Sequence, residues 1–201
     1  SPKLTALLRT RPYYSQAALV QSYKSHVLCL LEGSTGALYH ASNSVLAPLD
    51  AVQTRFLREL GLSPERAFLD NNLAPLSLRR DIAMLGLVFK CVRGLAHPLL
   101  CRLFPRDVRA SHRHATRTAE VRHSEQIVDR SESFRLNTSR RSLLGLARVF
   151  NLLPAEIVQL TSVSAFQSGL TSFARRLCRQ GYPEWSMRFS PRSTHQVLVK
   201  R

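Results

Sequence analysis

The sequence predicts a mainly α fold: a small irregular helical bundle with a long basic linker and a C-terminal helical segment. Apolar residues recur every three or four positions through residues 46–98, the spacing of one helix face. Proline and glycine stand where the helices of this stretch should begin and end. Short strands are expected only within 125–136. At 201 residues with 44% hydrophobic content, the chain can form one moderate core or two small ones.

The first half of the chain gives signals of unequal strength. Residues 1–12 show no clear pattern, and we expect either a frayed end or the continuation of an upstream segment. A ragged apolar stripe predicts a helix over 13–31, which Gly33 would end. Pro48 is suited to a first helical turn, so the next helix is predicted over 48–60.

Later helices are marked by caps. Ser63 followed by proline predicts a short helix over 63–69, and Pro75 begins the longest helix, which should end near Gly94. Pro154 marks another helix start, and Thr161 or Ser162 should cap a last helix that ends near residue 179. Trp185 and Phe189 are the expected anchors of an irregular tail. The predicted segments are an N-terminal helix (1–45), a helical core (46–105), a basic linker (106–141), a C-terminal helical segment (142–180) and an irregular basic tail (181–201).

Charge is high and unevenly distributed. The net charge is +16, and 25 of the 29 basic residues are arginine. Residues 102–148 carry 11 basic and 5 acidic side chains, whereas residues 46–101 carry 7 and 5. Arginine forms planar, bidentate contacts with phosphate. The excess therefore favours a polyanionic partner, nucleic acid first, over a merely solubilising surface.

Arginines of the helical core and the linker are the candidate nucleic-acid contacts. Those of the linker recur every three to five residues, so they would share one face of a helix or follow a phosphate backbone in an extended chain. A solvated charge run without a ligand is the open alternative. Few aromatic residues lie among them, so nonspecific, salt-dependent binding is expected there instead of base stacking. The candidates are Arg55, Arg58, Arg79, Arg80, Arg106, Arg109, Arg113, Arg117 and Arg122.

Catalytic and metal-binding patterns are weak. An interruption of the helical pattern and the start of the next predicted helix separate Asp70 from Asp81. We therefore expect structural roles for them instead of metal catalysis. The linker histidines His112, His114 and His123 match no zinc-finger spacing and lie in a cationic region, so solvated side chains are expected. No metal site, cofactor or small-molecule substrate is predicted.

Four segments resemble one known family, in the same order along the chain. SYKSHVLCLLEGSTGALYHAS (22–42) comes first, then LDAVQTRFLRELGL (49–62) and LAPLSLRRDIAMLGLVFKCVRGLAHP (73–98), and finally VFNLLPAEIVQLTSVSAFQSGLTSF (149–173). They are similar to the region that follows the palm, the thumb and beyond, in reverse transcriptases of non-LTR (LINE-type) retrotransposons. Phe150 stands where that family usually has a tryptophan before asparagine.

This resemblance implies a post-palm fragment of an RNA-directed DNA polymerase. The aspartate-bearing palm motif and an upstream endonuclease are absent from the sequence, so no catalytic residue is carried over and no enzyme activity is expected. The implied role is to support the polymerase, contact its palm, and bind RNA or an RNA–DNA hybrid through arginines.

Two other functions stay open at this point. One is a helical interaction or scaffold protein whose basic face meets an acidic partner, and the other is a decayed element without a selected function. The four cysteines are scattered without a CxxC pair, which favours a reducing intracellular compartment, nuclear or cytoplasmic. No apolar run is long enough to span a bilayer, so no membrane partner is expected.

Overall fold

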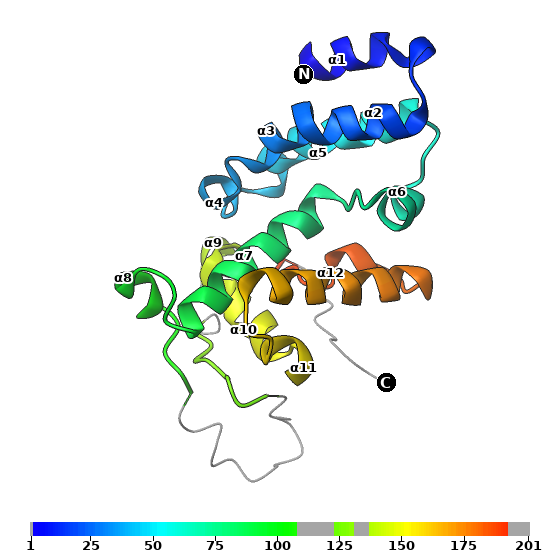
Figure 1. Ribbon diagram of the computed structural model, residues 1–201. Helices are drawn as coiled ribbons and strands as arrows, with labels where there is room; N and C mark the ends of the chain where they lie inside the picture. Colours follow the sequence, from blue (N-terminus) through cyan, green and yellow to red (C-terminus); the bar gives the residue numbers. More distant parts are fainter. Residues whose placement is uncertain (1, 108–122, 131–136, 193–201) are drawn as a thin grey trace.

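Helices make up nearly all the regular structure of the described residues, which are 2–107, 123–130 and 137–192 of a computed structural model. The one strand-like pairing among them is an isolated antiparallel bridge between Arg106 and Ile127. The predicted mainly α fold is therefore confirmed. Figure 1 shows the helices stacked from α1 at one end, through α2 and α5, to α7 and α12, with α10 and α11 at the other end.

The helix boundaries follow the sequence signals closely at α6, α7 and α12, whereas α9 lies within the stretch that was predicted to be an extended linker. In chain order the helices are α1 (Pro2–Arg9), α2 (Gln16–Tyr23), α3 (Cys29–Glu32), α4 (Thr35–Leu38), α5 (Asn43–Glu59), α6 (Pro64–Asn71), α7 (Leu76–Val92), α8 (Pro98–Cys101), α9 (Asn137–Arg141), α10 (Leu146–Asn151), α11 (Ala155–Val158) and α12 (Val163–Arg179). Short 3-10 turns cover Arg11–Tyr13, Leu143–Gly145 and Trp185–Met187, and a π-helical turn, Lys24–Leu28, joins α2 to α3.

Side-chain caps explain where two of the predicted helices begin. The Ser63 hydroxyl accepts a hydrogen bond from the backbone N–H of Arg66 at 3.2 Å, at the start of α6. The Ser162 hydroxyl does the same for Ala165 at 3.1 Å, at the start of α12. Each bond satisfies one of the N–H groups that a first helical turn leaves unpaired. Gly94 has φ +69° just after α7, which is the left-handed conformation that ends helices.

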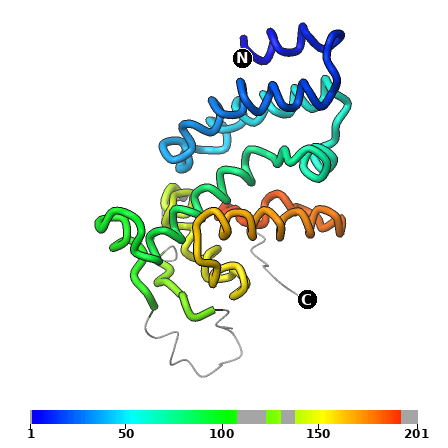
Figure 2. Tube along the Cα trace, in the orientation of Figure 1, coloured from blue at the N-terminus to red at the C-terminus, as the bar shows by residue number. Residues whose placement is uncertain are grey.

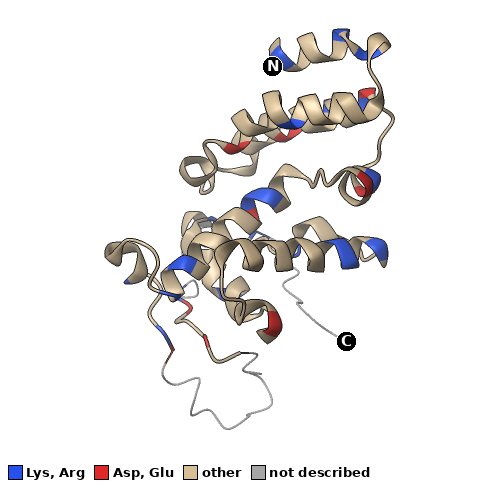
Figure 3. Ribbon diagram, viewed as in Figure 1, with Lys and Arg blue, Asp and Glu red and all other residues tan. Residues whose placement is uncertain are grey.

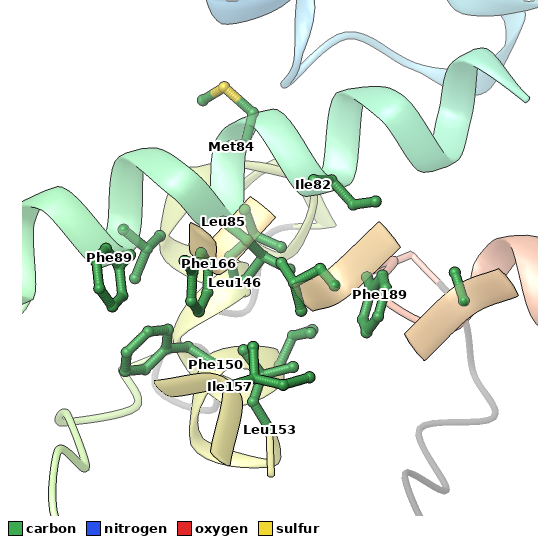
Figure 4. Packing of buried hydrophobic residues seen from close by; sticks show 14 of the residues in the cluster. Ile82, Met84, Leu85, Phe89, Leu146, Phe150, Leu153, Ile157, Phe166 and Phe189 are labelled. Carbon is green, nitrogen blue, oxygen red and sulfur yellow. The ribbon is translucent and has the colours of Figure 1, made fainter. Parts of the chain in front are cut away.

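The larger hydrophobic cluster lies between α7 and α12. Figure 2 shows these two helices crossing in the middle of the molecule, and Figure 4 shows the side chains packed between them and α10. The rings of Phe89 and Phe166 stack with their centroids 4.4 Å apart, and Phe150 lies 6.3 Å from Phe166. All three are fully buried, and each such side chain contributes about 1.5–3 kcal/mol through burial.

A second hydrophobic cluster joins the N-terminal helices to α5. The ring of Tyr23, from α2, stacks on Phe56, from α5, with centroids 4.1 Å apart. Leu4 of α1 and Leu73, just after α6, are buried in the same cluster. The two clusters are connected through α7, which begins beside the second and crosses the first.

The stretch 185–192, called the C-terminal segment below, packs back onto the bundle. The ring of Trp185 stacks on Phe68 of α6 at 5.2 Å, and Phe189 is completely buried. Both residues are therefore anchors, as predicted. This return brings the C-terminal segment beside α5 and the start of α7.

The N-terminal prediction was wrong. Residues 2–9 form α1 instead of a frayed end, because Leu4 is buried among residues of α2 and α5. The predicted helix over 13–31 begins only at Gln16, where the Ser15 hydroxyl accepts a hydrogen bond from the Ala18 N–H at 3.3 Å. Tertiary burial decides the first case and a side-chain cap decides the second.

Pro48 is also placed differently from the prediction. Helix α5 begins at Asn43, so Pro48 lies in its second turn and not in its first. Leu46 is buried one turn into the helix. Because that burial requires the earlier helical turn, it outweighs the hydrogen bond that proline cannot donate.

Candidate nucleic-acid interface

A cleft of about 700 Å³ opens between α5, the start of α7 and the C-terminal segment. Its arginine and aspartate side chains come from all three, and arginine is the more numerous. These side chains are Arg55, Arg58, Arg80, Arg192, Asp50 and Asp81. The cleft is therefore positively charged, which is the electrostatic condition for binding an anion.

Arg55 and Arg58 supply the available charge of this cleft. Both are exposed, and they lie three residues apart on α5, so they share one face of the helix. Within the described part of the chain, neither guanidinium has a hydrogen bond or an ion pair. Figure 3 shows the basic residues of the ribbon in blue, with α5 beside α2. These two groups are free to contact a ligand.

Arg80 is engaged inside the protein instead. Its guanidinium lies 2.8 Å from each oxygen of the Asp50 carboxylate, in a bidentate arrangement that joins α7 to α5. The Arg80 side chain is only 6% exposed. A guanidinium this buried and already paired is a structural contact, and it cannot turn to a phosphate without leaving Asp50 unpaired.

Arg79 points away from the cleft. It pairs with Glu32 of α3, with Nη2 3.1 Å from Oε2 and a second contact between Nε and Oε1. Together they line a separate cavity of about 320 Å³ between α3, α7 and α12. The two consecutive arginines therefore join α7 to two different neighbours, α3 and α5.

Of the five candidate arginines in the linker, one lies in the described part of the chain. Arg106 is exposed, and its guanidinium lies 2.7 Å from the carboxylate of Glu125, beside the bridge to Ile127. It lies on the stretch after α8 and does not line the cleft. The other four candidates, Arg109, Arg113, Arg117 and Arg122, lie outside the described residues.

The floor of the cleft contains a buried carboxyl group. The Tyr39 hydroxyl donates a hydrogen bond to Asp81 at 2.7 Å, and Ser190 also hydrogen-bonds to this carboxyl. Burial raises the pKa of Asp81 to about 7, although Tyr39, Arg192 and Arg80 act in the opposite direction. A large share of Asp81 is therefore neutral at pH 7, which leaves the cleft still more positive.

Arg192 closes the cleft from the C-terminal side. Its guanidinium donates to the carbonyl of Ala41 and to the side-chain oxygen of Asn43, each at 2.9 Å, and to the carbonyl of Tyr39. Burial lowers the pKa of this guanidinium. The sequence did not point to Arg192 or Tyr39, because no local pattern predicts a contact between residues 153 positions apart.

His123 corrects the expectation of solvated linker histidines. It is 5% exposed, its Nε2 lies 3.0 Å from the carbonyl oxygen of Phe150, and its ring meets the Phe150 ring edge-on at 5.4 Å. Burial lowers its pKa. It is part of the core, whereas His112 and His114 lie outside the described residues. In the described part of the chain, no three histidine, cysteine or acidic residues are grouped for a metal ion.

Comparisons with known proteins found no relative of the chain. No protein-family model, curated protein or solved structure matches the chain. Among the described helices, none combines the length and the apolar character that crossing a membrane requires.

Proposed function

We propose that the protein binds RNA, or an RNA–DNA hybrid, by its sugar-phosphate backbone, with Arg55 and Arg58 as the principal contacts in the described residues. The observation that carries this proposal is the pair of exposed guanidinium groups on one face of α5, at the wall of an open cationic cleft, which meet no partner among the described residues. Each can form a bidentate contact with a phosphate.

The surroundings of the pair support a backbone ligand over a small anion. The cleft is open and large, and its other two arginines are held by Asp50 and by groups of residues 39–43, where the chain passes from α4 to α5. A binding surface with two neighbouring cations, neither of them paired within the described ranges, matches successive phosphates of a chain. Contacts of this kind carry no base specificity, so affinity should depend strongly on salt.

The same proposal includes the origin of the chain as a non-catalytic post-palm fragment of a LINE-type reverse transcriptase. The resembling segments fall on defined elements: 49–62 covers most of α5, 73–98 covers α7, and 149–173 runs from α10 into α12. Exposed Leu95 and Leu99 would then be available to the missing palm. An Asp-Asp palm motif encoded directly upstream in the same transcript is the result that this origin requires.

Salt titration tests the binding proposal. The dissociation constant of a single-stranded RNA and of an RNA–DNA hybrid would be measured by fluorescence anisotropy over a series of KCl concentrations. The variant Arg55→Gln/Arg58→Gln should bind more weakly, and its log–log salt slope should be shallower by roughly 1.4 for single-stranded RNA, about 0.7 for each lost phosphate contact.

A charge-matched control separates this site from general basicity. Arg66→Gln/Arg148→Gln also removes two exposed arginines, but from α6 and α10 and outside the cleft. Its salt slope should equal that of the wild type. Equal slopes for both double variants would overturn the assignment. Displacement of RNA by polyglutamate, with no preference for RNA, would favour the scaffold protein with an acidic partner.

A further inference from the structure

Two neighbouring tyrosines project into solvent between α1 and α2. Tyr13 is 84% exposed and Tyr14 is 59% exposed, whereas Tyr23 and Tyr39 are buried in the bundle. Tyr13 ends the 3-10 turn, and Tyr14 is extended, with φ −126° and ψ 148°. Neither ring is used by either hydrophobic cluster. Two adjacent aromatic rings in water need an explanation that the fold does not supply.

Contacts on both sides fix this pair to the end of α5. Before it, Arg11 Nη1 donates to the carbonyl of Glu59 at 2.5 Å. After it, Gln16 Nε2 donates to the carbonyl of Leu60 at 3.1 Å. The backbone is stiffened further by Pro12, whose ring restricts φ. The tyrosines are therefore presented from a defined position and not from a loose loop.

That position adjoins the proposed phosphate contacts. Glu59 directly follows Arg58, and it lies one helical turn beyond Arg55 on α5. Arg11, at the start of the tyrosine turn, is exposed and forms an ion pair with the Glu59 carboxylate at 3.5 Å, which ties the turn to the last residue of α5. A chain bound along α5 by its phosphates would reach the tyrosines at the last turn of this helix.

We propose that Tyr13 and Tyr14 form a stacking platform for unpaired bases, so that the nucleic acid bound along Arg55 and Arg58 is single-stranded where it passes the end of α5. This inference rests on the proposed function. Aromatic rings stack on any base, but only on bases that are not already enclosed in a duplex. The arginines then determine affinity for the backbone, and the tyrosines determine the preference for single strands.

The experiment compares three RNAs of about 16 nucleotides: a single strand, a duplex of the same length, and an abasic single strand with the same number of phosphates. Tyr13→Ala/Tyr14→Ala should weaken binding of the single strand about tenfold, within the range for stacking. It should leave the duplex, the abasic strand and the salt slope unchanged. Tyr13→Phe/Tyr14→Phe should keep wild-type affinity because stacking needs no hydroxyl.

Matched variants make the outcomes distinguishable. Tyr182→Ala removes another partly exposed ring, after α12, and should change no affinity. If Arg55→Gln/Arg58→Gln flattens the salt slope but the tyrosine variant loses nothing on the single strand, the stacking platform is overturned and the backbone site stands. If the arginine variant also has no effect, the proposed function itself fails. Equal weakening on the abasic strand would also contradict stacking.

Discussion

The Tyr39 hydroxyl donates a 2.7 Å hydrogen bond to the Asp81 carboxyl, and both side chains are buried. Tyr39 follows α4, and Asp81 lies in the second turn of α7. Ser190 reaches the same carboxyl from the C-terminal segment. One buried acid therefore joins three parts of the chain that are far apart in sequence, and its protonation state should affect how firmly they are held.

Stability should fall as pH rises through neutrality because of Asp81. Burial raises its pKa from 3.8 to about 7, so the folded protein holds this proton more tightly than the unfolded chain. The contribution of this proton to the free energy of unfolding is complete below about pH 4 and is lost as pH passes 7. Relative to Asp81→Asn, the wild type should lose roughly 2–4 kcal/mol of unfolding free energy between about pH 4 and pH 8, measured by urea denaturation.

The comparison with Asp81→Asn removes the effects of other titrating groups. His123 acts in the opposite direction, because burial lowers its pKa and protonation on acidification destabilises the fold. It is present in both proteins and cancels. Parallel pH profiles for the wild type and Asp81→Asn would contradict the assignment to Asp81. Tyr39→Phe removes a donor to the carboxylate, so it should steepen the loss of stability.

Arg192 should hold the C-terminal segment in place. Its three donations reach acceptors at positions 39, 41 and 43, and Arg192→Ala would leave them without this partner. We expect a loss of about 2–3 kcal/mol and a red shift in the emission of Trp185, the only tryptophan in the chain. Arg192→Lys should be intermediate, because an ammonium cannot reproduce the fork of a guanidinium. Unchanged emission and stability in Arg192→Ala would refute this role.

The sequence predicts the helices well where their determinants are local. Helix α12 begins beside its capping Ser162 and carries an apolar residue at every turn, so it needs no tertiary information. Helix α1 has no such signal, and it depends on burial of Leu4 by distant helices. The cleft is not predictable for the same reason, since its floor joins Tyr39, Asp81 and Arg192 from separate parts of the chain.

Arginine spacing alone also cannot separate binding residues from structural ones. Arg79 and Arg80 are consecutive, and in sequence they are equivalent to Arg55 and Arg58 as candidate phosphate contacts. In the fold the first two meet the carboxylates of different helices, Glu32 of α3 and Asp50 of α5, while the other two meet none among the described residues. Whether an arginine is structural depends on where Glu32 and Asp50 lie in space, and only the tertiary structure provides those positions.

A double-mutant cycle should reveal the structural role of Arg80. Arg80→Gln and Asp50→Asn each break the pair between the buried guanidinium and the partly exposed carboxylate, so the double variant should cost less than the sum of the single variants. The expected coupling is about 1–3 kcal/mol in unfolding free energy. Arg55→Gln and Arg58→Gln should each change stability by less than about 0.5 kcal/mol, because they are exposed and unpaired in the described residues. Additive effects at Arg80 and Asp50 would contradict the pair.

Gly86 should be required by the close approach of Gln167. A Cβ at this buried position of α7 would lie 2.4 Å from Nε2 and 3.0 Å from Cδ of Gln167 on α12. Gly86→Ala therefore gains helix propensity but must displace the Gln167 side chain. In a Gln167→Ala background the clash is gone, and Gly86→Ala should stabilise the protein by up to about 1 kcal/mol, measured by thermal or urea unfolding.

The control for this pair is Gly36→Ala in α4, where a Cβ would meet no atom within 4 Å. This substitution should have the same small stabilising effect with glutamine or alanine at position 167, because only propensity changes. At Gly86 the sign or size of the effect should depend on that residue. The same effect of Gly86→Ala in both backgrounds would mean that Gln167 does not restrict this position. The packing of α7 on α12 would then have to tolerate a methyl group there without any rearrangement of α12.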